Sequence, residues 1–334
     1  MEVSSLKEMY QKVNEKAHTV FVVPLIRYNF PKTDYLFLLY ESLFSEYKIL
    51  SISVFAHIRF AITPLFNRKT ILHYHWVEFQ DAKSLFGMPY KLLCIALYRL
   101  FGGKIVWTVH NLKPHDQKFL ALHHTIHKWM AKISSVIHVH SKHQIPQVSD
   151  YYQQPKEKFV VLPHPVFPSE IKPQQEAIDK IRREYFLGTD MFKSPIFLIF
   201  GGISEYKGIQ DVIDILKEQN EEFTLILAGY MKKGQEHVHR YIMQHTSQDE
   251  RVKYIPRFIP EEHYPFLLSA ADICVFNYNE ILNSGGIQMA LSYQRKIIAP
   301  MKPGLLDFKK HPLVSLFETK EELKELLSST LSRG

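Results

Sequence analysis

Small and polar residues stand at a predicted strand–helix junction in the second half of the chain. The stretch NYNEILNSGGIQMALSYQRKIIAP (277–300) places Ser284, Gly285 and Gly286 directly before a helix-like segment. The first turn of a helix carries unpaired backbone N–H groups and the positive end of the helix dipole, so an anion can bind there. A plainer interpretation is that Ser284 caps the helix and the glycines only turn the chain. Cap residues are commoner than ligand sites, so this stretch alone favours the cap.

A second junction of this kind is FGGISEYKGIQDVIDIL (200–216), which runs from a predicted strand through a glycine turn into a helix. It matches neither the G-x-G-x-x-G dinucleotide fingerprint nor the phosphate-binding P-loop. Its glycines leave the backbone accessible, and Lys207 stands at the helix start, where an ammonium could neutralise a phosphate that backbone amides also hold. We expect Gly202, Ser204 and Lys207 to contact such a phosphate.

Histidines gather in the first half of the chain, which holds 13 of the 18. Those at the ends of predicted strands are His73, His75, His110, His138, His140 and His164. Ligands of open parallel sheets bind at the carboxyl ends of strands, so these imidazoles are candidates for a site. We interpret His73 and His138 as ordinary strand residues. The two His-x-His pairs could also hold zinc, but no His-Glu-x-x-His or Cys/His spacing supports a metal site.

Two of these histidine segments carry further polar and aromatic residues. TVHNLKPHD (108–116) contains His110, Asn111 and His115 in a loop that directly follows a predicted strand, and HYHWVEF (73–79) adds Trp76 next to His75. Imidazoles can bind sugar hydroxyls or move a proton, and an indole offers a face on which a sugar or lipid can stack. Each segment alone could be core packing, but together they favour an acceptor site.

The elements that must position these residues are short apolar strands alternating with helical patterns. The predicted strands are 19–26, 47–53, 71–77, 104–111, 135–141 and 159–165, followed by 194–202, 223–230, 252–256, 273–279 and 296–300. Near-continuous apolar strands separated by helices predict parallel sheets covered on both faces. We therefore predict an α/β protein with two Rossmann-like domains, 1–188 and 189–334, whose sheets face each other across a cleft. The last amphipathic helix could pack back across that cleft.

Charge is distributed unevenly between these predicted domains. Residues 1–188 hold 24 Lys and Arg against 15 Asp and Glu, a net +9, whereas the remainder holds 17 against 19, a net −2. This favours an anionic partner for the first domain, such as a membrane surface, while no nucleic-acid recognition motif is present. The segment 89–104, apolar with flanking basic residues, could lie at such a surface, although a crossover helix buried on the sheet is favoured.

The lack of a membrane-spanning run and the pattern of the cysteines indicate the cellular compartment. No apolar run reaches the roughly 18 residues needed to cross a bilayer, and the charged start is unlike a signal peptide. Cys94 and Cys274 lie in apolar patterns without metal or redox spacing, which predicts buried thiols in a reducing compartment. We expect a cytoplasmic protein, peripheral on the inner face of the plasma membrane.

The order of several motifs resembles the two-domain glycosyltransferases of the GT-B fold, specifically the large retaining group that uses nucleotide sugars. The resemblance covers nearly the whole chain and rests on TVHNLKPHD, VLPHPVF, FGGISEYKGIQDVI, LILAGY, FIPEEHYPFLLSAADICVFNYN and ILNSGGIQMALSYQRKIIAP. It implies that the first domain binds the acceptor and the second the nucleotide sugar. It places the family's catalytic-cleft histidine at His110 and its diphosphate-binding lysine at Lys207. Glu280, Asn283, Ser284, Gly285 and Gly286 are the further donor-binding residues that it implies.

The sequence also departs from the family's pattern. Many members carry two glutamates eight residues apart, whereas here Glu280 is followed at that spacing by Gln288, and alignment on the IIAP strand would put Met289 at the ribose position. A frequent arginine is replaced by Gly201 or Gly202, and RYNFPKTDY (27–35) stands in place of a glycine-rich loop. The chain is most similar to a polysaccharide-biosynthesis subgroup marked by SG, ALS and IIAP.

The resemblance implies a retaining hexosyltransferase that moves a sugar from a UDP- or GDP-linked donor to an acceptor hydroxyl. The expected acceptor is a lipid-linked glycan in surface polysaccharide assembly, and no metal or other cofactor is expected beside the donor. Two alternatives stay open: a non-catalytic GT-B partner subunit, and a sugar-nucleotide epimerase or phosphorylase on the same fold.

Overall fold

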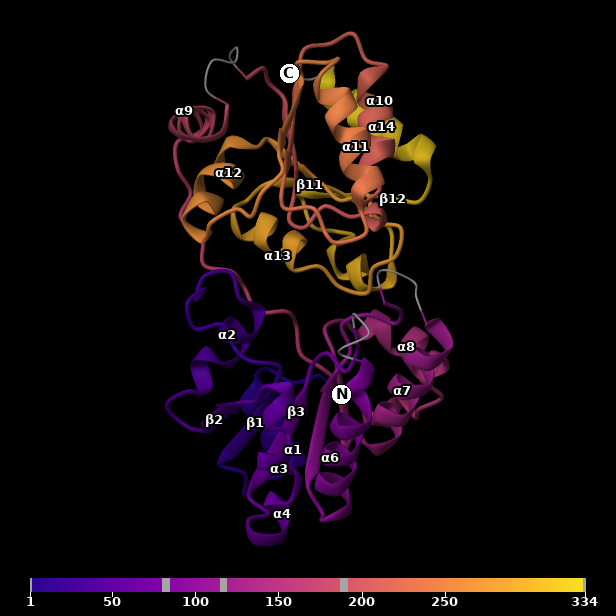
Figure 1. The fold of residues 1–334 in the computed structure, drawn as a ribbon. Coiled ribbons are helices and arrows are strands. Elements are labelled where there is room, and N and C mark those ends of the chain that lie inside the picture. Colours follow the sequence, from indigo (N-terminus) through magenta and orange to yellow (C-terminus); the bar gives the residue numbers. More distant parts are fainter. Residues whose placement is uncertain (1, 80–84, 115–118, 187–191, 333–334) are drawn as a thin grey trace. The chain divides into compact units, whose positions relative to one another are not determined.

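A computed structural model of the 334-residue chain describes residues 2–79, 85–114, 119–186 and 192–332. The chain forms two compact units, Met1–Pro165 (unit 1) and Val166–Gly334 (unit 2), each built around its own parallel sheet (Figure 1). The predicted α/β class and the two parallel sheets are therefore confirmed.

The sheet of unit 1 has six parallel strands in the order β2-β1-β3-β4-β5-β6. Their bounds are β1 Thr19–Val23, β2 Lys48–Ser51, β3 Thr70–Tyr74, β4 Lys104–Thr108, β5 Val136–Val139 and β6 Phe159–Val161. The helices of eight residues or more are α1 Leu6–Val13, α6 Met88–Leu100, α7 Leu120–Ile133 and α8 Ile145–Tyr152, and the shorter ones include α2 Tyr35–Tyr40, α3 Ile58–Ala61 and α4 Thr63–Phe66.

Alternate residues of β1 show why both faces of this sheet are covered. Val20 and Val22 join the core formed with α1 and α2, whereas the ring of Phe21 lies 6.1 Å from that of Phe60 in α3. Successive strand side chains point to opposite faces, so a strand packed on both sides must be apolar throughout. All five residues of β1 are buried.

The sheet of unit 2 also has six parallel strands, in the order β12-β11-β10-β7-β8-β9. Their bounds are β7 Ile196–Phe200, β8 Thr224–Ala228, β9 Val252–Ile255, β10 Ile273–Val275, β11 Lys296–Pro300 and β12 Val314–Phe317. The helices are α9 Gln174–Tyr185, α10 Ile209–Lys217, α11 Glu236–Thr246, α12 Tyr264–Ala270, α13 Gly285–Ser292 and α14 Lys320–Leu331. Figure 1 shows α10, α11 and α14 on one side of this sheet and α12 and α13 on the other.

The division between the units falls after Pro165, whereas the sequence suggested residue 188. The segment between these positions contains α9, which packs on α12 of unit 2. Hydrogen bonds also hold it there: the Lys172 backbone N–H donates to Ser269 Oγ at 2.9 Å, and the Gln174 side-chain amide donates to the Ala270 carbonyl at 3.2 Å.

The last helix, α14, packs within unit 2. Leu323, Leu327 and Leu331 are buried in the core of this unit, and the ammonium of Lys324 pairs with Glu218 at 2.6 Å. An amphipathic helix buries its apolar stripe on the nearest apolar surface, which here is formed by α10 and β12. These contacts replace the expectation that the helix packs back onto the first domain.

Candidate functional site

The strand order of unit 2 locates a crevice at the carboxyl ends of β7 and β10. These strands are neighbours, with β8 and β9 on one side and β11 and β12 on the other. Where the strand order reverses in this way, the connections leave toward opposite faces of the sheet and open a crevice that commonly binds ligands. The connection after β7 carries Gly202, Ser204 and Lys207, and the connection after β10 carries the segment from Glu280 to Ser284.

The side chain of Lys207 is buried beside the glycine turn. It is 5% exposed, and its Nζ donates a 2.5 Å hydrogen bond to the carbonyl of Phe200 at the end of β7. Gly201 has a φ of +86°, and a Cβ built on it would stand 3.1 Å from the same Nζ. A side chain at residue 201 would therefore crowd the amine, and glycine leaves that space free of protein atoms.

Burial changes the acidity of this amine. Loss of hydration, with the nearby charge of Lys232 as the smaller cause, lowers the pKa of Lys207 from 10.5 to about 7. At neutral pH the amine therefore gives up its proton readily, and a negative ligand beside it would restore the charge. Perturbed amines at a crevice are typical of functional sites.

Ser284 caps the helix that follows β10. Its Oγ accepts a 3.2 Å hydrogen bond from the Ile287 backbone N–H, and Gly285 and Gly286 form the first turn of α13. The cap predicted from the sequence is confirmed. Among the described residues the buried Nδ2 of Asn283 has no hydrogen-bond partner. An unpaired buried donor is costly, so a ligand that accepts from it would be stabilised.

Backbone and ring contacts bring these two connections together. The Asn279 backbone N–H donates to the Tyr206 carbonyl at 2.8 Å, and the rings of Tyr206 and Tyr278 stack with centroids 5.6 Å apart. Gly202, Ser204 and Lys207 are thereby held next to the connection that carries Glu280, Asn283, Ser284, Gly285 and Gly286. Glu280 is exposed on this connection, whereas Met289 is buried on α13.

In unit 1 the aromatic and imidazole rings gather around Tyr35. This residue begins α2 in the connection between β1 and β2, and its hydroxyl lies 3.2 Å from Nε2 of His140. Ring centroids within 6.1 Å of its own belong to His75, Trp76, His110, His140 and His164. The structure thus brings together the strand-end histidines, as the sequence suggested, around a tyrosine that sequence reasoning missed.

The pair of rings most closely stacked in this group is Trp76 and His110, with centroids 4.1 Å apart and planes 15° from parallel. The Nε2 atom of His110 lies 3.2 Å from Nδ1 of His75, so one of these imidazoles donates to the other. Trp76 is partly exposed and His110 is 7% exposed. Asn111 is partly exposed in the loop that follows, and His115 lies outside the described residues.

A buried hydrogen-bond chain lies beneath these rings, and one carbonyl fixes its direction. His138 Nε2 must donate to the Leu162 carbonyl, 2.9 Å away, so its Nδ1 accepts from the Thr108 hydroxyl at 2.8 Å. Thr108 in turn accepts from Nε2 of His73 at 2.7 Å. The Nδ1 of His73 is left as an acceptor, and the hydroxyls of Tyr10 and Tyr40 each lie 2.6 Å from it, so one of these phenols donates to it.

These imidazoles are neutral at neutral pH. Burial, with neighbouring histidines as the smaller cause, lowers the pKa of His73, His75, His110 and His140 well below the usual range. Burial likewise lowers the pKa of His138 and of His164 to about 4. A neutral His110 can donate or accept a hydrogen bond at a hydroxyl but brings no charge. In the described part of the chain no group of three or more His, Cys, Asp or Glu residues could hold a metal ion.

Solved structures share this fold of two units. The Anabaena protein Alr3699/HepE, solved in complex with UDP-glucose, matches with a TM-score of 0.62 at 15% identity, covering 93% of this chain and 88% of that chain. An α,α-trehalose-phosphate synthase (UDP-forming) from Burkholderia vietnamiensis matches with a TM-score of 0.62 at 10% identity, covering 95% and 90%. The fold is that of the GT-B glycosyltransferases.

Sequence comparison finds two relatives that carry the same name. A GDP-mannose:glycolipid 4-beta-D-mannosyltransferase from Xanthomonas campestris pv. campestris is 24% identical over 245 residues, which are 71% of this chain and 62% of the relative. A second protein of the same name and species is 23% identical with the same coverage. The chain spans less than two thirds of the length of these relatives. No protein-family model matches it.

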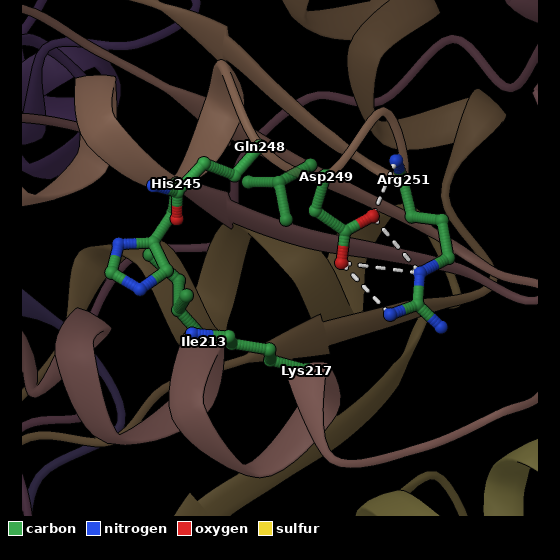
Figure 2. Close-up of a pocket in the computed structure, with 7 residues that line it drawn as sticks. Ile213, Lys217, His245, Gln248, Asp249 and Arg251 are labelled. Atoms are coloured by element: carbon green, nitrogen blue, oxygen red, sulfur yellow. Dashed lines mark hydrogen bonds and ion pairs between the residues drawn. The ribbon is translucent and has the colours of Figure 1, made fainter.

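Hollows are present on the described part of unit 2, and one of them lies far from the crevice. That one is a pocket of about 290 Å3 at the amino end of β9. Figure 2 shows Asp249 paired with Arg251 at this pocket, with Lys217 from the end of α10 and His245 from the last turn of α11 nearby. Parallel sheets rarely bind ligands at this edge, so we assign it no role. A second hollow of about 250 Å3 adjoins the crevice and is lined by residues that include Asn277, Asn279, Lys302 and Lys320.

Both cysteines of the GT-B chain are free and buried, as predicted. Of the helices that the structure describes, none has the length and apolar character required to cross a bilayer.

Proposed function

We propose that the protein is a glycosyltransferase that moves a sugar from a UDP- or GDP-linked donor to an acceptor hydroxyl. The observation that carries this proposal is the meeting of the Lys207 turn and the Ser284 helix start at the carboxyl ends of β7 and β10. A buried amine with a pKa near 7 beside a helix N-terminus fits a diphosphate, which bears negative charge and offers several acceptor oxygens.

In this proposal the donor's diphosphate lies between Lys207 and the first turn of α13. The leaving nucleoside diphosphate gains negative charge as the glycosidic bond breaks, so a protonated Lys207 and the amides of Gly285 and Gly286 would stabilise the transition state. The unpartnered Nδ2 of Asn283 would donate to a phosphate or sugar oxygen. Gly202 and Ser204 complete the phosphate side, and Glu280 faces the hexose. No metal or other cofactor takes part in this arrangement.

The acceptor belongs to unit 1 in this proposal. Trp76 would stack on an acceptor sugar, while His75, Asn111 and His115 would bind its hydroxyls. Because burial keeps His110 neutral, its role is to orient the sugar by a hydrogen bond and not to remove a proton as a strong base. We further propose retention of configuration, with attack on the face that the diphosphate leaves and with the departing phosphate taking the acceptor's proton.

A lipid-linked glycan of surface polysaccharide assembly is the proposed acceptor. The name of these relatives specifies a glycolipid acceptor and GDP-mannose as donor, which supports this class and makes GDP-mannose a donor to test first. The net charge of +9 in residues 1–188, 24 basic against 15 acidic, supports an anionic membrane surface as partner. We propose a cytoplasmic location, peripheral on the inner face of the plasma membrane.

The first test is donor binding. A panel of UDP- and GDP-sugars is screened for thermal stabilisation, because a ligand that binds only the folded state raises Tm by mass action. We expect one nucleotide series to raise the Tm of the wild type but not that of Lys207→Met. A non-catalytic partner subunit would bind none of the panel, and that outcome would overturn the proposal.

The second test is the reaction itself. The stabilising donor is incubated with a polyprenyl-diphosphate-linked sugar, and the product is isolated. Transfer that requires the acceptor supports the proposal, whereas conversion of the donor alone indicates an epimerase or phosphorylase. The anomeric configuration of the new linkage is read by NMR. A β-linked product, as in the relatives' name, formed from an α-linked donor would contradict retention while leaving the transferase proposal intact.

A further inference from the structure

Unit 1 exposes large apolar side chains on two segments that flank β3. Phe55, Phe66 and Phe86 are 92%, 83% and 89% exposed, which is more than any other large apolar residue of the described chain. Ile58, Leu93 and Leu100 are also more than half exposed. Single exposed apolar residues are ordinary, but a group of them on one face marks a surface that another body covers.

These residues form one surface because α3 and α6 pack against each other. The Tyr90 hydroxyl donates to the Phe55 carbonyl at 3.2 Å and accepts from the Ile58 backbone N–H at 3.1 Å. On the inner side the rings of Phe60 and Tyr98 lie 5.8 Å apart. We call the outer side, formed by Phe55, Ile58, Phe66, Phe86, Leu93 and Leu100, the apolar face.

Helix α6 shows how unusual this face is. It is the crossover helix favoured from the sequence, because Cys94, Ile95 and Tyr98 are buried toward β4. Its opposite side presents Leu93 and Leu100, with no acidic residue in the helix. A helix that is apolar on the side facing away from its own core is normally covered by protein or lipid.

Charge surrounding the apolar face is of one sign. Residues 47–77 contain four basic residues (Lys48, Arg59, Arg68 and Lys69) and no acidic one. Arg99 is exposed near the end of α6, and it is basic as well. Lys48 and Lys104 are exposed at the first positions of β2 and β4, and Lys69 is exposed directly before β3. The apolar face is therefore bordered by a basic edge.

We propose that the apolar face docks on the surface of an anionic lipid bilayer. Exposed phenylalanines and leucines enter the boundary between headgroups and acyl chains, while the basic edge attracts anionic headgroups. A second copy of this chain is a poorer occupant, because a two-fold dimer would set the same basic edges against each other without acidic partners. None of the described helices is long and apolar enough to cross a bilayer, so these side chains would rest on the bilayer surface.

The docking places the acceptor side of the chain at the membrane. Phe55 follows the carboxyl end of β2, which lies at the same edge of the parallel sheet as the carboxyl end of β3, where His75 and Trp76 stand. This purpose of docking rests on the proposed function, in which the acceptor is lipid-linked, but the docking itself requires neither donor nor acceptor.

The test is co-sedimentation of the full chain with vesicles of phosphatidylcholine, with and without phosphatidylglycerol, in low salt and in high salt. We expect binding to the phosphatidylglycerol vesicles that weakens with salt, because screening shortens the reach of the basic edge. The variant Phe55→Ser/Phe66→Ser/Phe86→Ser should lose binding at least tenfold. Arg59→Glu/Lys69→Glu/Lys104→Glu should lose it at least as strongly, since each charge near an anionic surface strengthens binding roughly fivefold.

The matched control is Met243→Ser/Phe258→Ser, which removes exposed apolar residues from unit 2 and should bind vesicles as the wild type does. Donor-induced stabilisation of the triple phenylalanine variant should equal that of the wild type, so a failed docking proposal is distinguishable from a failed donor site. Equal vesicle binding by the wild type and the triple variant would overturn the proposal. So would a wild-type dimer that the triple variant converts to monomer in sedimentation velocity without any vesicle binding, because the occupant would then be a second copy.

Discussion

The side-chain amide of Asn277 donates a 2.9 Å hydrogen bond to the carbonyl of Gly208. Asn277 lies in the connection that follows β10, and Gly208 directly precedes α10 in the connection that follows β7. The bond therefore fixes these two connections to each other. The approach is close because residue 208 lacks a side chain: a Cβ there would lie 2.4 Å from Asn277 Nδ2 and from the Asn277 carbonyl oxygen. Gly208 also has a φ of +57°, which favours glycine.

Gly208→Ala should destabilise unit 2 severely. The strained backbone and the clash with Asn277 act together, and we expect a loss of about 3–5 kcal/mol in the free energy of unfolding. The matched control is Gly234→Ala, which has a φ of +82° but no atom within 4 Å of the new Cβ. It should cost only about 1–2 kcal/mol, the strain term alone. Urea denaturation measures both, and equal losses would show that the contact with Asn277 is unimportant.

Stability should fall in mild acid because of the buried histidines of unit 1. An unfolded chain protonates its histidines near pH 6.5, whereas burial lowers the pKa of His138 and His164 to about 4 in the folded chain. Between these values the unfolded state binds more protons, so the free energy of unfolding decreases as the pH falls and is fully present only above 6.5. Urea midpoints measured from neutral pH down to pH 4 should decline steadily. Midpoints that stay level would contradict neutral burial of these imidazoles.

Thr108→Val should cost stability without changing shape. The hydroxyl both accepts from His73 and donates to His138, so valine leaves two buried ring nitrogens unpaired. Each unpaired group costs about 1–3 kcal/mol. Thr246→Val is the control, because its exposed hydroxyl only donates to a helix carbonyl, and it should change stability little. If Thr108→Val were as harmless, the chain of tautomers deduced from the Leu162 carbonyl would be wrong.

Donor binding should take up a proton through Lys207. Its pKa is lowered to about 7 in the free protein, so at a pH about one unit higher Lys207 is neutral in most protein molecules. A bound diphosphate favours the ammonium and raises the pKa again, so binding takes up about one proton. Calorimetry with UDP or GDP in two buffers of different ionisation enthalpy measures this uptake. Lys207→Met should abolish it and weaken binding by about 1.5–3 kcal/mol.

The control for this experiment is Lys233→Met, an exposed lysine in the same unit, which should keep both uptake and affinity. Uptake that persists in Lys207→Met would assign the proton to another group and remove Lys207 from the diphosphate.

Much of the fold could be predicted because buried parallel strands are apolar throughout. Ten of the eleven predicted strands contain a strand of the structure, and the remaining one, 71–77, overlaps β3, which begins one residue earlier. The twelfth, Val314–Phe317, was missed because it lies at the edge of its sheet and only Phe317 is buried, so it lacks the continuous apolar run. The packing partners of α14 could not be predicted for a related reason: an apolar stripe identifies a buried helix but not the surface that buries it.

Candidate site residues could be predicted where they directly follow a strand, and they were missed where they do not. His75 and His110 stand just after β3 and β4, which marked them. Tyr35 follows β1 by a long connection, and the sequence showed there only the lack of a glycine-rich loop. The buried position of Lys207 and the exposure of Phe66 depend on side-chain packing, which no local spacing encodes. Whether the described residues bind donor and acceptor as proposed stays a prediction.

The Ser284 hydroxyl caps α13, and two substitutions can show whether it also contacts a phosphate. Alanine at an N-cap costs about 0.5–2 kcal/mol, whereas glycine costs only a few tenths. Ser284→Ala and Ser284→Gly therefore differ in stability although both remove the hydroxyl. If the hydroxyl contacts the donor's diphosphate, both variants should lose donor affinity by a similar factor. If the hydroxyl is only a cap, donor affinity should fall only as far as the stability of the protein falls. Ser284→Gly should then bind the donor almost as tightly as the wild type does.

Gly286→Ala completes this experiment, because its new methyl group would stand at the mouth of α13. The Cβ would lie 3.1 Å from Cε1 of Phe276 and 3.6 Å from Ser284 Oγ, so the Phe276 ring must shift by a few tenths of an ångström. We expect a loss of about 1 kcal/mol in stability from this overpacking and a larger loss in donor affinity if the diphosphate lies on the first turn. Ser5→Ala, which removes the cap of α1 in unit 1, controls for lost stability and should leave donor affinity unchanged. A Gly286→Ala protein that is less stable but binds UDP- and GDP-sugars like the wild type would reduce Ser284, Gly285 and Gly286 to a cap and a turn.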